Sequence, residues 1–140
     1  CIQCTTPLVN CQDIDSCIEK LLQNPQAHSA VAIAEARQHP HKALKLIDDG
    51  RGGKKLVTYF TESGREVTPL ARQNYEKAYF RANLIACRTP VIFNSGSLTG
   101  DHVLYHVIPQ ERAVDIDSPT DFFVLEQLMS RFNKKNNYGG

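Results

Sequence analysis

The feature that most constrains the fold is the uncharged run at residues 29–34, which consists of small and β-branched side chains. Such a run is typical of a strand that is covered on both faces. Before it, residues 13–23 carry apolar side chains at helical spacing, with Asn10 or Asp13 as the expected cap. Residues 1–3 have the character of a strand end. Strand, helix and strand in this order predict an α/β protein.

The middle of the chain has a different pattern. Residues 41–47 and 54–60 flank an Asp- and Gly-rich turn, which predicts a hairpin. Residues 61–81 are polar and irregular, with basic side chains spaced through them. This stretch at 61–81 does not have the pattern of a sheet core, and we expect it to be an insertion, a lid or a partner surface.

Regular structure is predicted again after this insertion. Residues 83–87 and 101–108 are expected to be strands, with a short helix at 88–94 between them. Residues 114–117 (VDID) have the pattern of a strand end. The helix that follows has Ser118 as its N-cap and Pro119 in its first position.

Asp115 and Asp117 are the main candidate site residues. If residues 114–117 are a strand, the two carboxylates project to one face about 7 Å apart. At the carboxyl end of a strand in an α/β sheet, that face borders the ligand crevice. Two carboxylates there are suited to Mg²⁺, which is held in addition by substrate phosphates. The alternative is that Asp117 caps the next helix and that Asp115 is simply solvated.

Other polar residues have both a functional and a structural interpretation. Arg72 and Arg81 have the chemistry to clamp a carboxylate or a phosphate, although arginines in loops are commonly solvated. Gln3, Thr5 and Thr6 end the first strand, where they either contact a ligand or satisfy the backbone of a turn.

Thiol and zinc chemistry have weaker support. Cys1 and Cys4 form a CxxC, but no second pair of ligands follows at metal-binding spacing. His39 and His41 flank Pro40 without a third ligand nearby in the sequence, and Cys87 has no histidine at a spacing that suggests a nucleophile pair.

Bulk properties limit the partners. The formal net charge of the 140 residues is +1, which gives no reason to expect binding to nucleic acid or to a membrane surface. No apolar run approaches the roughly 20 residues that span a bilayer, and the start does not resemble a signal peptide. We expect a cytoplasmic protein.

Four segments, in order, resemble the acylneuraminate cytidylyltransferases, which make CMP-sialic acid. Residues 2–8 (IQCTTPL) are similar to the LQPTSPLR segment of the family, and residues 38–45 (QHPHKALK) to its HHPxK segment. The basic stretch at 72–83 resembles RQxLPxxYRxNGAIY. Residues 111–121 (ERAVDIDSPTD) resemble ERSVDIDTPxD, which is the most specific of the four.

The resemblance implies that a hydroxyl of a nine-carbon acidic sugar attacks the α-phosphorus of CTP and releases pyrophosphate. Asp115 and Asp117 would hold Mg²⁺. Sugar or phosphate contacts would come from five other residues that the family motifs match: Gln3, Thr5, Asn83, Arg72 and Arg81, with Thr6 beside them. Lys42 would lie in the segment that crosses to the other subunit of a homodimer and would complete the site of the partner.

The implied fold is a three-layer, Rossmann-like nucleotidyltransferase fold, truncated at its N-terminus. Its sheet-and-helix core would comprise residues 1–38 and 82–135, its dimerisation arm 39–81 and its tail 136–140. The basic, glycine-containing loop with which the family grips CTP precedes these segments, so the chain by itself is not expected to turn over CTP. The alternative is a non-catalytic, dimeric sugar-binding or interaction module that is derived from the same fold.

Overall fold

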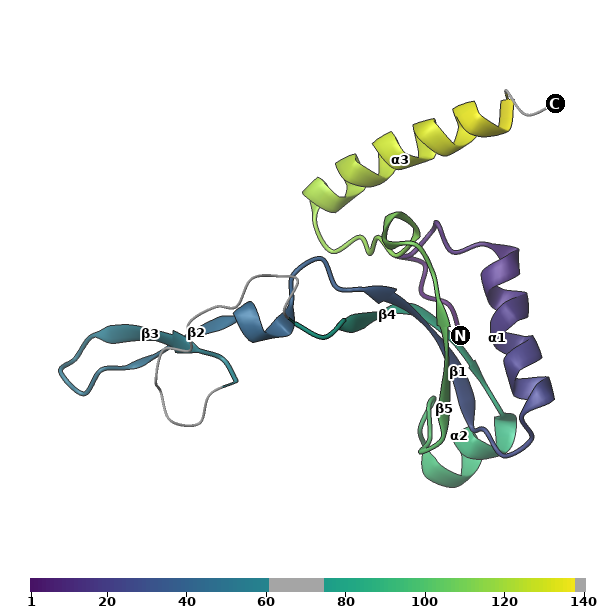
Figure 1. Ribbon diagram of the computed structural model, residues 1–140, viewed down its shortest axis with the longest axis horizontal. Helices are drawn as coiled ribbons and strands as arrows, with labels where there is room; N and C mark the ends of the chain where they lie inside the picture. The colour runs from purple at the N-terminus through teal and green to yellow at the C-terminus, as the bar shows by residue number, and fades with distance from the viewer. Residues whose placement is uncertain (61–74, 138–140) are drawn as a thin grey trace. The chain divides into compact units, whose positions relative to one another are not determined.

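The computed structural model describes residues 1–60 and 75–137 of the chain, and side chains as far as residue 132. The chain forms two compact units. The first contains Cys1–Glu35 and Phe80–Gly140, and the second contains Ala36–Tyr79. The elements of both units are labelled in Figure 1.

A three-stranded sheet forms the centre of the first unit, in the order β4 (Tyr79–Cys87), β1 (Ser29–Glu35) and β5 (Val103–Val107). β1 and β5 are parallel, with Ser29 opposite Val103 and Ile33 opposite Val107. β4 is antiparallel to β1, because Arg88 after β4 donates its N–H to His28, which precedes β1. The structure is therefore a mixed α/β protein, whereas the finer Rossmann-like nucleotidyltransferase fold stays a prediction.

The N-terminal segment extends this sheet at β4. Ile2 forms an antiparallel bridge with Leu84, and the Gln3 N–H donates to the Asn83 carbonyl oxygen at 3.2 Å. Because β4 is antiparallel to both neighbours, the N-terminal segment runs in the same direction as β1. Residues 1–3 form an isolated bridge rather than a strand, so the predicted strand–helix–strand unit is confirmed for its helix at Cys11–Gln23 and for β1, with β4 lying between the N-terminal segment and β1.

Helix α1 (Cys11–Gln23) packs against β1 and β5 on one face of the sheet (Figure 1). Asn10 caps the helix: its side chain accepts the Asp13 N–H, while the Asp13 side chain accepts the Asn10 N–H. Cys17 and Leu21 of α1 are buried against a core that also contains small β1 side chains and Leu84. The small residues of β1 allow the helix to approach the sheet closely.

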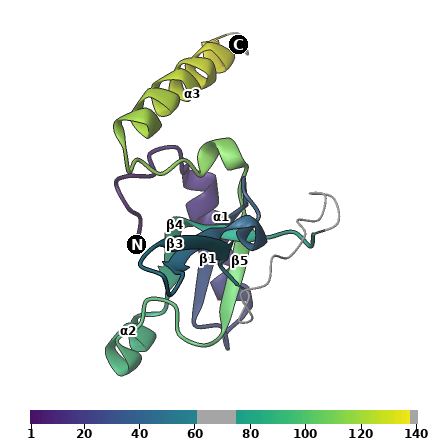
Figure 2. The same cartoon turned by 90° about the vertical axis from the view of Figure 1, so that its left-hand side faces the viewer.

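The two ends of the sheet carry different elements, as Figures 1 and 2 show from perpendicular directions. The short helix α2 (Thr89–Ser95), which confirms the helix predicted at 88–94, lies at one end. The short helix η3 (Gln110–Arg112) lies at the other end, after β5. The segment that contains Asp115 and Asp117 follows η3 directly.

The prediction that residues 114–117 end a strand is wrong. The last strand of the sheet ends at Val107, and residues 113–116 form neither helix nor strand. Val114 is nevertheless buried, which accounts for the apolar alternation that suggested a strand. Strand alternation therefore does not place Asp115 and Asp117 on one face.

Helix α3 (Pro119–Asn137) begins where the sequence predicted. The Ser118 hydroxyl accepts the Asp121 N–H at 3.4 Å and donates to Asp121 Oδ2 at 2.6 Å. Pro119 occupies the first helical position. Among the described residues, no helix has the length and apolar character needed to cross a membrane.

The second unit contains the short helix η1 (Pro40–Lys42) and the predicted hairpin, formed by β2 (Leu44–Asp48) and β3 (Lys54–Thr58). Asp49 closes the turn, since its carboxylate accepts the N–H groups of Arg51 at 2.7 Å and Gly53 at 2.9 Å. These hydrogen bonds hold the pKa of Asp49 below its ordinary value.

Candidate metal-binding site

Asp115 is the described residue whose chemistry points most directly to a ligand. Its Oδ2 accepts a hydrogen bond from the Asn83 side-chain amide at 2.6 Å. Its Oδ1 is buried and has no hydrogen-bond partner within the described residues. Because a buried carboxylate oxygen normally has a partner, this orphaned atom indicates a position for a cation or a hydrogen-bond donor.

The backbone at Asn83 directs its side chain to Asp115. Asn83 lies in β4 but has a φ of 54°, in the left-handed region. Asparagine is one of the few residues that adopts this conformation at modest cost. On one side, the Asn83 carbonyl oxygen accepts the Gln3 N–H. The N-terminal segment also contacts the segment that contains Asp115, since the Ile116 N–H donates to the Thr5 carbonyl oxygen at 3.0 Å.

Asp117 is placed differently from Asp115. It is exposed, and its backbone N–H donates to Asp121 Oδ2 at 3.3 Å. The side chain that caps α3 is that of Ser118, not Asp117. Asp117 therefore has no capping role, and its carboxylate faces solvent two residues after Asp115.

The donor set fits Mg²⁺ better than a metal that needs a complete protein cage. Within residues 1–60 and 75–137, no group of three or more His, Cys, Asp or Glu side chains is placed to hold a metal ion. Mg²⁺ commonly keeps several waters and takes one or two carboxylates together with substrate phosphates. A buried, unpartnered oxygen on Asp115 with an exposed carboxylate on Asp117 is compatible with that mode.

One buried carboxylate, that of Asp13, was expected from the sequence only as a possible helix cap and not as the centre of a polar cluster. Asp13 is 1% exposed, and its Oδ2 accepts from Arg112 Nη1 at 2.9 Å. Its Oδ1 lies 3.2 Å from His106 Nε2. The sequence signal was present, because Asp13 occupies the third position of a helix behind an asparagine cap. Nothing in the local pattern indicated partners that lie 93 and 99 residues away.

The structure brings only some of the other predicted residues to this region. Thr6 is buried, and its hydroxyl donates to the Gln3 carbonyl oxygen at 3.0 Å. Gln3 and Arg81 are exposed in the first unit, and Lys42 is exposed in the second. Arg72 lies outside the described residues. The ligand roles of these side chains stay predictions.

Within the part of the chain that the structure describes, the alternative zinc and thiol chemistries gain no supporting geometry. Cys1 and Cys4 are free and exposed. Both ring nitrogens of His39 are engaged: Nδ1 accepts the His41 N–H at 3.3 Å, and Nε2 lies 3.0 Å from the Glu76 carbonyl oxygen. Cys17 is buried, and this burial is the main cause of its raised pKa. The negative charge of Asp13 raises the pKa of Cys17 further. A thiol with a raised pKa is a poor nucleophile at neutral pH.

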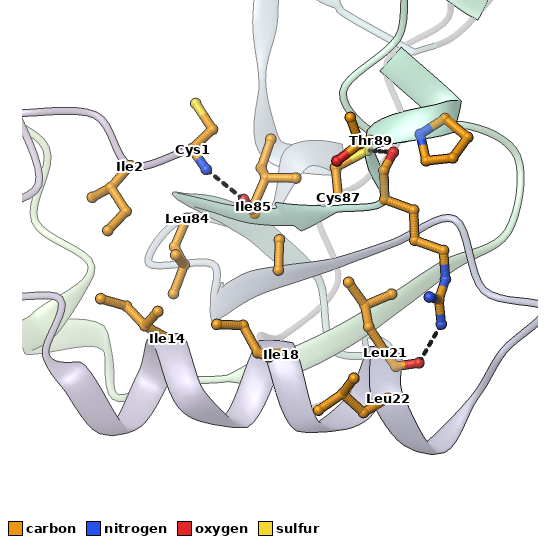
Figure 3. Close-up of a pocket in the computed structure, with 13 residues that line it drawn as sticks. Cys1, Ile2, Ile14, Ile18, Leu21, Leu22, Leu84, Ile85, Cys87 and Thr89 are labelled. Carbon is orange, nitrogen blue, oxygen red and sulfur yellow. Dashed lines mark hydrogen bonds between the residues drawn. The ribbon is translucent and has the colours of Figure 1, made fainter. Parts of the chain in front are cut away.

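An apolar hollow of about 630 Å³ lies elsewhere, between α1 and the N-terminal segment with β4 (Figure 3). Ile14, Ile18 and Leu22 line it from the helix, and Ile2 and Ile85 from the opposite side. No acidic residue lines it. It is therefore distinct from the Asp115 site. Arg88, which also lines it, donates from its guanidinium to the carbonyl oxygens of Ala27 and Leu21.

The fold and the site together define a mixed α/β protein with a candidate carboxylate metal site at one end of its sheet. No protein-family model matches the chain. Over 133 residues, or 94% of its length, the chain is 26% identical to the post-translational flagellin modification protein B of Campylobacter coli. It spans 52% of the length of that relative.

Proposed function

We propose that this chain is the metal- and sugar-binding part of a nucleotidyltransferase that transfers CMP from CTP to a nine-carbon acidic sugar of the sialic acid type. The observation that carries the proposal is the buried, unpartnered Oδ1 of Asp115. Support comes from the ERAVDIDSPTD segment at 111–121, whose resemblance to the cytidylyltransferase signature includes this aspartate. An activated acidic sugar is also a reagent that a protein-modification pathway, such as that of the flagellin-modifying relative, would consume.

The reaction assigns definite tasks to the residues of this chain. A sugar hydroxyl loses its proton to solvent, and its oxygen forms a bond to the α-phosphorus of CTP. The bond from that phosphorus to the oxygen that bridges it to the β-phosphate breaks, and pyrophosphate leaves with the electron pair. Mg²⁺, when bound, supplies neutralisation of the charge on the phosphates. Asp115 would provide a ligand oxygen, and the Asn83 amide would hold the other oxygen of that carboxylate at 2.6 Å. Asp117 would provide the second carboxylate.

The partners follow from the same proposal. Arg81, together with Arg72, would face the sugar carboxylate or the phosphates, and Gln3 would contact the sugar. Lys42 and the β2–β3 hairpin would belong to the arm of a homodimer. A two-stranded hairpin is marginally stable alone in water, which supports a role for it in packing against a partner.

The experiment is a titration of the 140-residue chain with Mn²⁺, followed by electron paramagnetic resonance, with and without CTP. Asp115→Asn is expected to weaken Mn²⁺ binding at least tenfold, since it removes the ligand charge. The matched control is Asp101→Asn, which neutralises an exposed carboxylate just before β5, at the other end of that strand. Unchanged Mn²⁺ affinity in Asp115→Asn would remove the metal role.

Substrate binding is tested separately by saturation-transfer NMR with N-acetylneuraminic acid, with glucose as the uncharged comparison. The nucleotidyltransferase proposal expects the acidic sugar to bind in preference to glucose, and more tightly with Mn²⁺ and CTP present. Binding of the acidic sugar that is indifferent to Mn²⁺, CTP and Asp115→Asn would favour the non-catalytic sugar-binding module instead.

A further inference from the structure

The carboxylate of Asp13 is nearly inaccessible to solvent, and it makes contacts in three directions. Its Oδ2 accepts hydrogen bonds from the Asn10 N–H at 3.1 Å and from Arg112 Nη1 at 2.9 Å. Its Oδ1 lies 3.2 Å from His106 Nε2. An isolated buried carboxylate is strongly unfavourable, so these partners are needed for Asp13 to stay in the core. The cluster joins the start of α1, the strand β5 and the helix η3.

Arg112 connects this cluster to the candidate site. It is the last residue of η3 and lies three residues before Asp115. The side chain of Arg112 is only partly exposed, at 23%, against 2% for that of Asp13. The ion pair therefore fixes the backbone at the point where the chain leaves η3 and enters the segment that contains Asp115.

Other contacts hold the same segment at its two sides. The Gln110 side-chain amide donates to the Glu35 carbonyl oxygen at 2.8 Å. Val114 is 5% exposed, and the Ile116 N–H donates to the Thr5 carbonyl oxygen. Residues 113–116 lack the hydrogen-bond ladder of a strand or helix. Their conformation must therefore be maintained by such individual attachments.

We propose that Asp13 and Arg112 are positioning residues for Asp115: their ion pair holds residues 112–116 so that the carboxylate of Asp115 stays against Asn83 with Oδ1 directed to the metal. This inference rests on the proposed metal role of Asp115. Partners that support a metal ligand from behind commonly change metal affinity by 10- to 100-fold when they are removed. The coupling makes α1, which contributes no ligand of its own, a determinant of the site.

The test compares Arg112→Gln, Arg112→Lys and Leu21→Ala in the 140-residue chain. Leu21→Ala is the control for lost stability, because it removes a buried side chain from the same helix α1, eight residues after Asp13 and near the other end of the helix. Mn²⁺ affinity is measured at 10 °C, after circular dichroism has confirmed that each variant is folded. Arg112→Gln is expected to raise the Mn²⁺ dissociation constant about tenfold or more. Arg112→Lys should recover part of the loss, and Leu21→Ala should bind as the unmodified chain does.

A second measurement reports on the position of Asp115 without any metal. The Asn83 side-chain amide donates to Asp115, so its proton resonance in a ¹⁵N-labelled sample is shifted by that hydrogen bond. Arg112→Gln should move this resonance toward the position of a solvated asparagine, whereas Leu21→Ala should leave it in place. If Arg112→Gln is unfolded at 10 °C, Arg112→Lys carries both measurements, with a severalfold weaker Mn²⁺ affinity and a partial shift expected.

The results separate this inference from the proposed function. Loss of Mn²⁺ binding in Asp115→Asn, with unchanged binding and an unchanged Asn83 resonance in the Arg112 variants, would overturn the positioning role alone. Equal losses in Leu21→Ala and Arg112→Gln would also overturn it, because they would show a general effect of stability. Unchanged binding in Asp115→Asn would overturn the metal role and the positioning role that rests on it.

Discussion

Replacing Asn83 by glycine and by alanine separates the two reasons why asparagine stands at this position. Both variants lose the hydrogen bond to the Asp115 carboxylate, which is worth about 1.5–3 kcal/mol for a charged acceptor. Alanine must also adopt the left-handed backbone with a φ of 54°, at a cost of about 1–2 kcal/mol. Glycine adopts it freely but loses more chain entropy on folding, at about 0.5–1 kcal/mol. The backbone cost of alanine exceeds the entropy cost of glycine, so Asn83→Gly should be more stable than Asn83→Ala by roughly 0.5–1 kcal/mol.

The assay is urea unfolding at 25 °C, monitored by circular dichroism. The free energies of unfolding are compared between variants whose unfolding free energy depends on urea concentration with the same slope. Both variants should be less stable than the unmodified chain, with Asn83→Ala the less stable of the two. The usual order is the reverse, since alanine commonly stabilises a strand relative to glycine. An Asn83→Ala variant as stable as Asn83→Gly would refute the argument that the left-handed backbone at position 83 penalises an alanine side chain.

Two further predictions concern ionisable groups. In the folded chain the pKa of Asp49 lies below its ordinary value of 3.8. The ionised carboxylate therefore stabilises the hairpin turn fully above pH 3.8, and this stabilisation is lost as the pH falls through the folded pKa. A carboxyl titration by NMR should show the depressed midpoint, which Asp49 would lack if the turn did not form. The Cys17 thiol, with its raised pKa, should react with a disulfide reagent at pH 8 only when the chain unfolds, whereas exposed Cys4 and Cys11 react at once. Mass spectrometry measures the rate at which each cysteine is labelled. If Cys17 were labelled as fast as Cys11, the burial of Cys17 would be contradicted.

Elements with a strong local signal were predictable from the sequence. The helix at Cys11–Gln23 has apolar periodicity and a capping box, and residues 29–34 of β1 are an uninterrupted run of small and β-branched residues. The hairpin was predicted because an Asp- and Gly-rich turn separates two apolar segments. Each of these signals is contained within about a dozen consecutive residues, where hydrogen bonding and burial follow directly from the local pattern.

The segment at 114–117 shows where such reasoning fails. Alternation of Val114, Asp115 and Ile116 satisfies the pattern of a strand, but a strand also needs a neighbour with free backbone groups along its length. Ile116 finds one such group, at Thr5, and no ladder forms. The approach of Asp115 to Asn83 depends on this irregular path and on a left-handed residue within β4. The same path sets the different environments of Asp115 and Asp117.

The sequence by itself determined the α/β character, the position of the capped helices and the presence of two aspartates before α3. Only the tertiary structure decided that one aspartate has a buried oxygen without a partner among residues 1–60 and 75–137, while the other aspartate is exposed. It also decided that Asp13 and Arg112 pair across 99 residues of chain. The physical reason is that periodicity and capping act between neighbours in sequence, whereas the burial and pairing of a charge depend on which distant segments the folded core brings together.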